Sequence, residues 1–497
     1  MMDATPMPKW VWATHRVVGA LAVSTWLYLA PLLGMMAGRV LLPGLEPERL
    51  GAFDPLSTLA ATLVWGLPNV LLTVGVFFAL GAVTRRMFPV YIGGVFLFVG
   101  YLGSAAFLRD LDNRTLGILI DPFGTAALGQ ITRYWTPAEQ NTLVPWPTGA
   151  SLANRVLWLG VGLSALLGGV ALARLDQYGW QPLGRFRRPE TEGELPDAPA
   201  ASVVLPTLTR SFDAGVRLRQ LIALSRRALG DVVGHRYFWA FVGAAVLFEL
   251  LNSQAIGTSY GTDTFPVTYQ VLQIFEGTLG IFMLVILTFY AGDLVWAERD
   301  LGQAQLLDSS PVPDALPLLA KALALAAVLV GLHTTILVLG PLVQLVNGYT
   351  HFELGLYLQS LYGLSLVDWL PYVALALVVH AVVNHKVAGH AVMIGLYIAM
   401  MFRGSWGFEY NLPWFGADPG RQYSDMNGWG FALGPFLAFK AYWLAVGAWL
   451  LVVARLAWVR GTDAGWRPRL AEARRRLDGP TRGALGASSV VVLALGG

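Results

Sequence analysis

The sequence contains no cysteine, and only 13% of its 497 residues are charged. The absence of cysteine excludes disulfides, thiolate metal sites and cysteine nucleophiles. A soluble domain carries about 25% charged residues. The low charge, the 55% hydrophobic content and the mean hydropathy of +0.56 therefore indicate a protein embedded in lipid. The N-terminal stretch does not resemble a cleavable signal peptide, because its apolar segment is far longer than an h-region.

Motifs for nucleotide and metal chemistry are also missing. The chain has neither a GxxxxGK[ST] loop, which would cradle nucleotide phosphates, nor an HExxH sequence. His380, His385 and His390 are five residues apart, which is a turn of about 140° per step on a helix, so we expect them not to converge on one metal. We predict no catalytic residue, no metal site and no cofactor in this chain, and a protein that is not an enzyme.

Long apolar segments dominate what is present. A membrane-spanning helix needs about 20 mostly apolar residues, and irregular backbone facing lipid would leave its amides unsatisfied. An apolar run that starts at Ala484 is too short to cross. We predict an all-α, polytopic integral membrane protein with about 10 transmembrane helices plus a partial eleventh. The predicted spans are 17–36, 58–83, 88–108, 154–173, 238–256, 271–296, 315–343, 368–384, 387–402 and 434–458.

The basic residues fix the predicted orientation. With the N-terminus in the cytoplasm, most of the 34 Lys and Arg residues fall in inner segments or at inner helix ends, as the positive-inside rule requires. We therefore predict a multi-pass protein of the cytoplasmic (inner) membrane. Two segments rich in Trp, Pro and Gly, 109–153 and 403–433, are then outside, either as structured loops or as a substrate-gating lid.

One large inner segment divides the predicted spans. Its first part is a polar, proline-rich linker, and its second part is a basic amphipathic helix. That helix either lies on the membrane surface or packs against a partner helix. The predicted organisation is a first transmembrane half at 1–173, a cytoplasmic linker at 174–210, a second transmembrane half at 211–460, and a basic segment with the start of a further span at 461–497.

A short internal similarity suggests that the two halves are copies. "LANRVLWLGVG" at 152–162 and "LAFKAYWLAVG" at 437–447 match at six positions, and Arg155 corresponds to Lys440. Each stretch follows a long outer loop and two spans that are joined by a short basic turn. Parallel repeats of this kind are a transporter architecture, although chance similarity between apolar helices is the alternative.

Three ionisable residues fall inside the predicted spans: Glu249, Glu276 and His333. A carboxylate inside a membrane is costly unless it is paired or hydrated, so these residues are intramembrane candidates for function. His333 is a candidate partner for Glu249. The pair could be structural, or it could belong to a translocation or proton path.

The stretch between the sixth and seventh spans interrupts the apolar pattern. Glu298, Arg299 and Asp300 open a polar segment that ends at Pro311 and Pro313. The segment 298–313 is longer than a tight turn needs, and 298–310 can form about three helical turns. We expect a stiff cytoplasmic helix that contacts a soluble partner.

"GDLVWAERDLGQAQLLDSSPVP" at 292–313 resembles the permease of type-2 ABC exporters. The resemblance implies two parallel-repeat halves of the ABC-2 permease type. It also implies that 298–313 is the coupling helix, where an ATP-binding cassette subunit docks on Glu298, Arg299, Asp300, Pro311 and Pro313. "LIDPFGTAAL", "YWTPAEQNT", "NRVLWL", "GYTHFELGLYL" and "YSDMNGWG" are similar to the membrane half of bacterial permease and zinc-aminopeptidase fusion proteins.

The resemblance implies a permease subunit that exports a substrate, with ATP bound by a separate subunit. Relative to that family, the chain is expected to be truncated at both ends. The alternative function is a membrane anchor for an extracytoplasmic aminopeptidase-like domain; a third is a secondary transporter that uses Glu249 as its proton site. The expected partners are the ATP-binding cassette subunit and the lipid bilayer, with a second permease copy or a C-terminal peptidase domain as further candidates and no nucleic acid.

Overall fold

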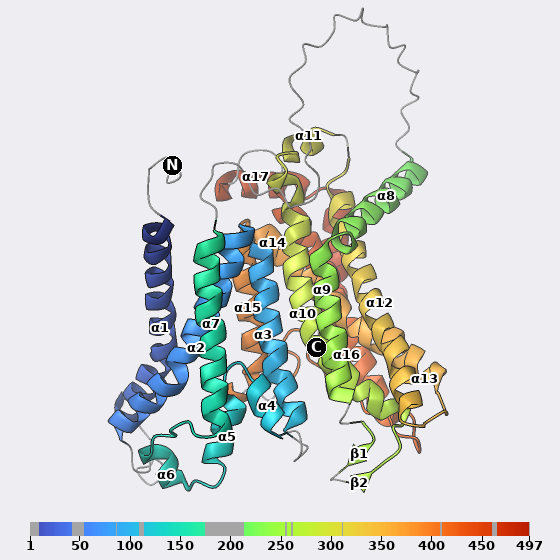
Figure 1. Ribbon diagram of the computed structural model, residues 1–497. Coiled ribbons are helices and arrows are strands. Elements are labelled where there is room, and N and C mark those ends of the chain that lie inside the picture. The colour runs from blue at the N-terminus through green and yellow to red at the C-terminus, as the bar shows by residue number, and fades with distance from the viewer. Residues whose placement is uncertain are drawn as a thin grey trace, which may run out of the picture. The chain divides into compact units, whose positions relative to one another are not determined.

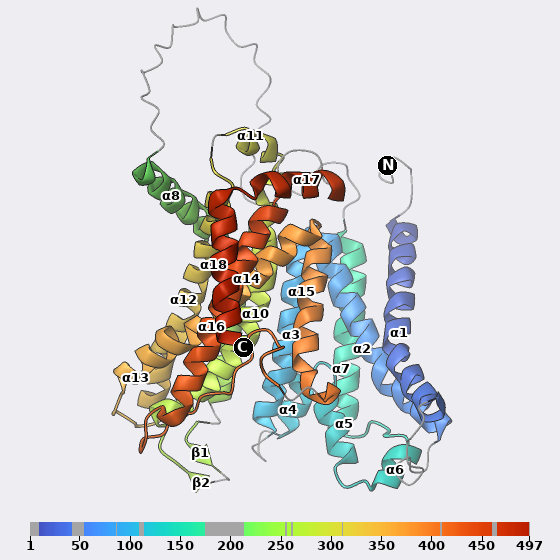
Figure 2. The ribbon, with the colours of Figure 1, turned by 180° about the vertical axis from the view of Figure 1, so that it is seen from behind.

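The computed structural model describes residues 9–41, 54–85, 87–108, 114–173, 213–253, 256–259, 262–310, 312–407, 410–459 and 465–496. The predicted linker at 174–210 and Pro311 lie outside the described residues. The chain divides into two compact units, 1–210 and 211–497. Figures 1 and 2 show both units as bundles of helices.

The predicted fold class is confirmed. The described residues are almost entirely helical, and their only strands are the two-residue β1 (Thr258–Ser259) and β2 (Thr262–Asp263), which form an antiparallel hairpin. Seven of the ten predicted spans coincide with helices that are long and apolar enough to cross a membrane, and two more coincide with shorter apolar helices. The seven are Trp10–Gly38, Pro55–Thr84, Ala150–Leu172, Thr268–Asp300, Ala315–Val346, Leu354–Val383 and Gly430–Ala457.

The first unit is built around two long helices that touch through glycine. An added Cβ on Gly162 would lie 2.7 Å from the Cα atom of Leu72, and one on Gly75 would lie 2.2 Å from the carbonyl oxygen of Gly162. Only glycine permits backbones to approach this closely. The elements of this unit are α1 (Lys9–Leu41), α2 (Pro55–Thr84), α3 (Met87–Phe107), α4 (Arg114–Ile120), α5 (Thr125–Thr132), α6 (Pro137–Thr142) and α7 (Ala150–Leu172), and the glycine contact joins α2 to α7.

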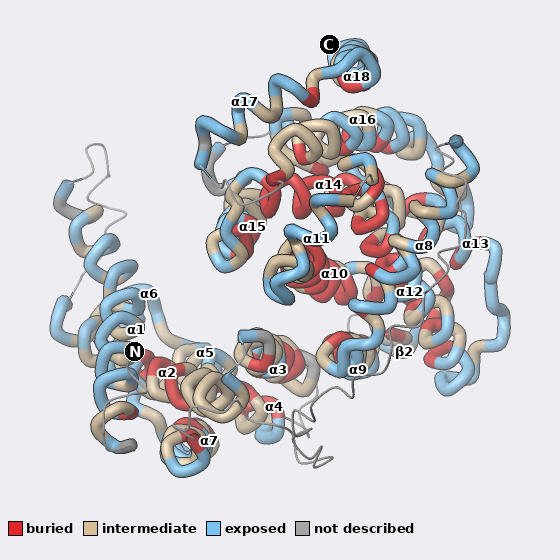
Figure 3. Tube along the Cα trace, turned by 90° about the horizontal axis from the view of Figure 1, so that it is seen from above, coloured by how far each residue is buried: buried red, intermediate tan, exposed pale blue. Residues whose placement is uncertain are grey.

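The second unit packs around one central helix, α10, which contacts α9, α12, α14 and α15. Figure 3 shows the buried residues of this unit gathered on α10 and the helices beside it. Apolar side chains on several faces of α10 are buried, as expected for a helix surrounded by others. The helices of this unit are α8 (Ala214–Val233), α9 (Arg236–Ser253), α10 (Thr268–Asp300), α11 (Ala304–Asp308), α12 (Ala315–Val346), α13 (Leu354–Leu358), α14 (Leu366–Val383), α15 (Lys386–Met401), α16 (Leu433–Ala457), α17 (Trp466–Arg476) and α18 (Gly479–Gly496).

Helices α8, α11 and α17 lie at one end of this second unit, whereas α13 and the β1–β2 hairpin lie at the opposite end (Figure 1). The end with α11 is the one that the basic residues predict to be cytoplasmic, and we call it the inner end. The predicted amphipathic helix is present as α8, which packs against α12. Val232 near its C-terminus is buried, while Leu218 and Ile222 are exposed, so only part of the apolar face meets the bundle.

The predicted span 368–384 starts earlier than expected. Helical backbone begins at α13 and continues into α14 through a π-helical segment, Gln359–Ser365. The polar residues Gln359 and Ser360 interrupt the apolar pattern, which is why the sequence suggests a loop there. Segments of π-helix inside longer helices are often found at functional sites.

Candidate functional site

The stretch 298–310, predicted to form about three helical turns within the coupling helix 298–313, is not one continuous helix, so that expectation was wrong. Glu298, Arg299 and Asp300 form the last turn of α10, and the chain then turns at Gly302, whose φ of +68° is left-handed. Glycine adopts this conformation at little cost and commonly ends helices. Only the five residues of α11 form a separate helix, which lies across the inner end of the unit (Figure 1).

The three charged residues at the end of α10 bind groups inside the chain. Glu298 accepts hydrogen bonds of 2.7 and 2.8 Å from the Lys321 ammonium, which also donates to the Leu294 carbonyl. Asp300 pairs with Lys386 at 2.8 Å. Arg299 donates hydrogen bonds to the Asn384 side chain at 2.7 Å and to the Val459 carbonyl at 3.1 Å. These residues therefore join α10 to its neighbours, and their predicted role in docking a partner stays a prediction.

Two leucines of this segment are more exposed than its charged residues. Leu301 is 67% exposed and Leu306 is 75% exposed. Pro313 is exposed as well. Behind α11 lies a small cavity of about 110 Å³, lined by residues of α10, α11, α14 and the chain after α16. Leu301 and Leu306 thus form an exposed apolar surface, which we call the apolar knob. It lies next to the ion pairs of Glu298 and Asp300.

The basic segment after residue 460 contributes helix α17, which closes the inner end. Arg469 donates hydrogen bonds to the carbonyl oxygens of Ala381 and Val382 in α14 and of Ala457 in α16. These carbonyls belong to the last turns of their helices, where no intrahelical donor is available. Because a cation at a helix C-terminus also meets the negative end of the helix dipole, Arg469 fastens α17 to both helices.

The proposed pairing of Glu249 with His333 was wrong. The ring nitrogens of His333 lie 2.8 Å from the Leu329 carbonyl and 3.0 Å from the Ser365 hydroxyl. Glu249 is fully buried in α9, and its two carboxylate oxygens have no hydrogen-bond partner among the described residues. The structure therefore separates two residues that the sequence suggested as a pair.

Two of the three histidines lie close together, although they are ten residues apart in the sequence. His380 of α14 and His390 of α15 face each other across a helical hairpin, with ring centroids 4.9 Å apart. Helix α14 ends at Asn384 and α15 begins a new helix. The rotation per residue of one continuous helix therefore does not determine how His380 and His390 are oriented. Within the described ranges, no group of three or more His, Cys, Asp or Glu residues could hold a metal ion.

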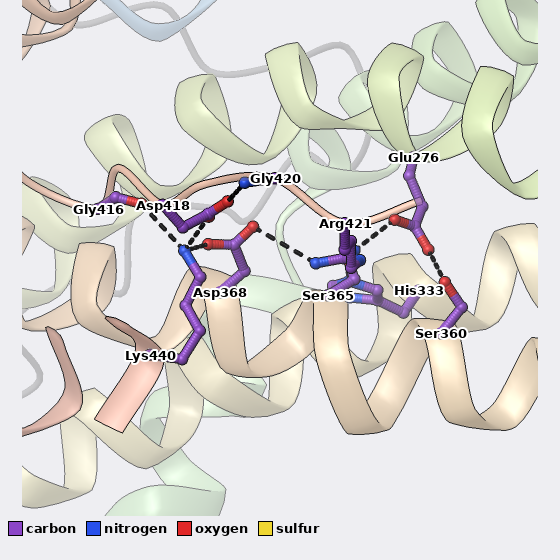
Figure 4. A network of polar contacts seen from close by, with 10 residues as sticks. All are labelled: Glu276, His333, Ser360, Ser365, Asp368, Gly416, Asp418, Gly420, Arg421 and Lys440. Carbon is purple, nitrogen blue, oxygen red and sulfur yellow. Dashed lines mark hydrogen bonds and ion pairs between the residues drawn. The ribbon is translucent and has the colours of Figure 1, made fainter. Parts of the chain in front are cut away.

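Glu276, the third intramembrane candidate, belongs to a network of charges at the outer end of the second unit (Figure 4). One carboxylate oxygen accepts a hydrogen bond of 2.5 Å from Ser360 in the π-helical segment. The other pairs with Arg421 at 2.7 Å, and Arg421 lies 3.8 Å from Asp368 of α14. No local pattern in the sequence marks Ser360, Arg421 or Asp368 as candidate site residues.

Lys440 of α16 completes this network. Its ammonium contacts the carboxylates of Asp368 and Asp418 and donates a hydrogen bond of 3.0 Å to the Gly416 carbonyl. The side chain of Lys440 is 1% exposed. A buried ammonium is stable only when it is paired and hydrogen-bonded, so the two carboxylates account for a lysine at this position.

Beside the network lies a pocket of about 340 Å³, which we call the outer pocket. Its buried floor is mainly apolar, with Leu356 and Phe436 beside Ser360, while Gln273 and Gly277 at its rim are exposed. Its lining combines three carboxylates, one guanidinium, amides and aromatic rings. The lining residues are Tyr269, Leu272, Gln273, Glu276, Gly277, Leu356, Ser360, Asp368, Asp418, Arg421, Gln422, Tyr423, Trp429 and Phe436.

Equivalent positions in the two units make equivalent contacts. Arg155 and Lys440, which the internal similarity aligns, are both buried. Three residues later, Trp158 and Trp443 each donate the indole N–H to a carbonyl of the preceding outer loop, at 2.9 and 2.8 Å. Local geometry therefore supports the predicted internal repeat, because chance similarity between apolar helices would not reproduce such specific contacts.

The short turns of the two halves also correspond. Arg85 ends α2 with a φ of 54°, and Asn384 ends α14 with a φ of 50°. Among the described residues, these are the only non-glycine residues with positive φ. Such a conformation is uncommon for residues with a side chain, so its occurrence at both turns is further support for a repeat.

Residues 235–403 match the family model described as ABC-2 family transporter protein. The matched region begins just before α9 and ends just after α15, so it contains α11 and Glu276 but not Arg421 or Lys440. No curated protein and no solved structure matches the chain. The ABC-2 match supports an ABC-type permease, the membrane component of a transporter. The resemblance to permease and aminopeptidase fusion proteins stays a prediction.

Proposed function

We propose that the chain is the permease subunit of an exporter in the cytoplasmic membrane, driven by a separate ATP-binding cassette subunit that docks at α11. The observation that carries this proposal is the ABC-2 match over residues 235–403. The matched region includes α11, which stands at the end of the unit rich in basic residues. ATP would be bound by the partner, and this chain would supply the path through the membrane.

The docking surface we propose is the apolar knob formed by Leu301 and Leu306. Both side chains are exposed at the inner end, and a soluble partner gains free energy by covering such groups. The ion pair between Glu298 and Lys321 lies directly beneath and joins α10 to α12. A force applied to α11 would therefore reach two long helices at once.

The orientation can be tested with single cysteines, because the sequence contains none. We expect a Gln303→Cys variant to react with a membrane-impermeant maleimide only from the cytoplasmic side. We expect Met426→Cys, in the outer loop, to react only from the opposite side, since both positions are exposed. Labelling is measured in intact cells and in inverted vesicles. Reaction of position 303 from outside the cell would overturn the proposed topology.

Docking at α11 predicts a specific loss of association. Leu306→Glu places a charge in the centre of the apolar knob, where a bound partner would have to desolvate it. We expect at least about a tenfold loss of co-purifying partner, which corresponds to about 1.4 kcal/mol. The tagged chain is purified from its native host, and proteins with Walker motifs are quantified by mass spectrometry.

Met426→Glu is the matched control, because Met426 is also exposed and apolar but lies on the outer loop. It should retain the partner at the level of the unmodified chain. Equal recovery with Leu306→Glu would show that α11 is not the docking surface. Absence of any ATP-binding cassette subunit from the unmodified sample would count against the permease function itself.

A further inference from the structure

The outer pocket has the properties of a built ligand site. Its floor includes the buried residues Leu356, Ser360 and Phe436, and its rim includes the exposed residues Gln273 and Gly277. The volume of about 340 Å³ lies within the range of small-molecule sites. Its polar groups come from α10, the π-helical segment, α14 and the outer loop, so their convergence depends on the whole fold of the unit.

The charges that line the pocket do not balance. Three carboxylates, those of Glu276, Asp368 and Asp418, face a single lining cation, Arg421. Lys440 pairs with two of these carboxylates from behind, where it is buried. With both cations counted, three ionised carboxylates leave a net charge of −1. A partly buried negative charge is stabilised by a cation nearby, so the pocket favours a positively charged ligand over an anion.

One wall of the pocket is aromatic. The rings of Tyr269 and Tyr423 have centroids 6.1 Å apart, and those of Tyr423 and Trp429 lie 5.3 Å apart. Tyr423 stays protonated, because desolvation and the carboxylates of Glu353 and Asp425 raise its pKa above the usual value of 10. Aromatic faces attract organic cations, and they also cover apolar groups attached to the charge.

The equivalent position of the first unit provides an internal comparison. Arg155 is buried like Lys440, but its hydrogen bonds go to side-chain amide oxygens of Asn69 and Asn154 and to the Pro122 carbonyl. The buried carboxylate of Asp121 interacts with the Arg155 charge, but the hydrogen bonds of Arg155 go to other groups. The repeat therefore needs a buried cation at this point, but it does not need carboxylates paired directly with that cation. The three carboxylates of the second unit pair with Arg421 and Lys440 but exceed these cations by one, and a cationic ligand would balance that charge.

We propose that the outer pocket binds an organic cation, a protonated amine or quaternary ammonium carried on an apolar or aromatic body. The charge would lie near Glu276 and Asp368, and the apolar body would lie against Tyr269, Tyr423 and Trp429. Binding requires no ATP-binding subunit. Only the additional step, that such a cation is the transported substrate, rests on the proposed function.

The test uses the full chain in nanodiscs of zwitterionic lipid, with ethidium as the cationic probe and fluorescence anisotropy as the readout. We expect saturable binding in the micromolar range. Fluorescein, an aromatic anion, should neither bind nor compete. If ethidium shows no saturable binding, or if fluorescein competes with it, the proposal is overturned. Because no ATPase is present, this outcome leaves the proposed permease function untouched.

Gly277→Leu blocks the pocket without touching the charge network. An added Cβ at Gly277 meets nothing within 4 Å, so the side chain can extend over the pocket, and we expect ethidium affinity to fall at least about tenfold. Gly331→Leu on α12 is the matched control, because this glycine is also exposed with open space around its Cβ. Its affinity should equal that of the unmodified chain.

A second variant removes part of the aromatic wall. Trp429 lies on the outer loop, outside the long helices, so Trp429→Ala should leave the bundle folded. Loss of one cation–π partner predicts ethidium binding about three- to tenfold weaker. The proposal fails if both Gly277→Leu and Trp429→Ala bind ethidium as tightly as Gly331→Leu does.

Discussion

Replacing Lys440 with methionine is expected to lower the free energy of unfolding by about 3–5 kcal/mol, the usual cost of breaking a buried ion pair. The ammonium is 1% exposed and contacts two carboxylates, Asp368 and Asp418. Methionine has a similar length and fills the same space, so the loss measures the charge and not the packing. The measurement is equilibrium unfolding of the purified chain in mixed micelles of dodecyl maltoside and SDS.

Two control variants separate this effect from a general loss of charge. Lys386→Met removes a lysine that is about a third exposed and pairs with Asp293 and Asp300. Solvent screening limits the value of such pairs, so we expect a cost of about 1 kcal/mol or less. Adding Asp368→Asn to Lys440→Met should restore part of the stability, because one stranded carboxylate is removed. Equal costs for Lys440→Met and Lys386→Met would contradict the buried-pair interpretation.

The second large effect is expected at the inner end. Lys321→Met should lower the free energy of unfolding by about 2–4 kcal/mol, because Lys321 is 5% exposed and Glu298 would lose its partner. The figure is below that for Lys440, since Glu298 is about a third exposed and water can screen it. Unfolding is measured as for Lys440, and hydrogen exchange of 301–310 should become faster.

A double-mutant cycle tests whether the pair acts as a unit. Glu298→Met alone leaves a buried ammonium unpaired, but Glu298→Met combined with Lys321→Met leaves no charge behind. The double variant should therefore be more stable than the sum of the two single effects predicts, by more than about 0.5 kcal/mol. Strictly additive effects would mean that the contact contributes nothing beyond its separate side chains.

The sequence predicts the long helices well, because the requirement for about 20 apolar residues is local. The predicted span 58–83 falls within α2, which runs from Pro55 to Thr84. Prediction failed where the local pattern conflicts with tertiary structure. Polar residues in Gln359–Ser365 suggest a loop, yet this segment is π-helical, and its Ser360 hydroxyl reaches Glu276 on another helix.

The outer pocket could be predicted only in part. Glu276 stands out because a carboxylate is rare in an apolar span, and the internal similarity marks Lys440. Their partners are far away in the sequence, however, as in the pair of Arg421 with Glu276, and no local pattern shows which loop residue returns to which helix. The same reason explains the wrong pairing of Glu249 with His333, which rested on span position alone.

A single helix connects the two ends of the second unit. Glu276 in the outer pocket and Glu298 beneath α11 both belong to α10, and no proline interrupts its 33 residues. The two residues are 22 positions apart, which corresponds to about 33 Å at 1.5 Å per residue. Sharp kinks in helices usually need a proline or a comparable defect, so we expect α10 to move as one rigid helix. If a partner pushes or tilts the inner end, we expect the spacing between Glu276 and Arg421 to change.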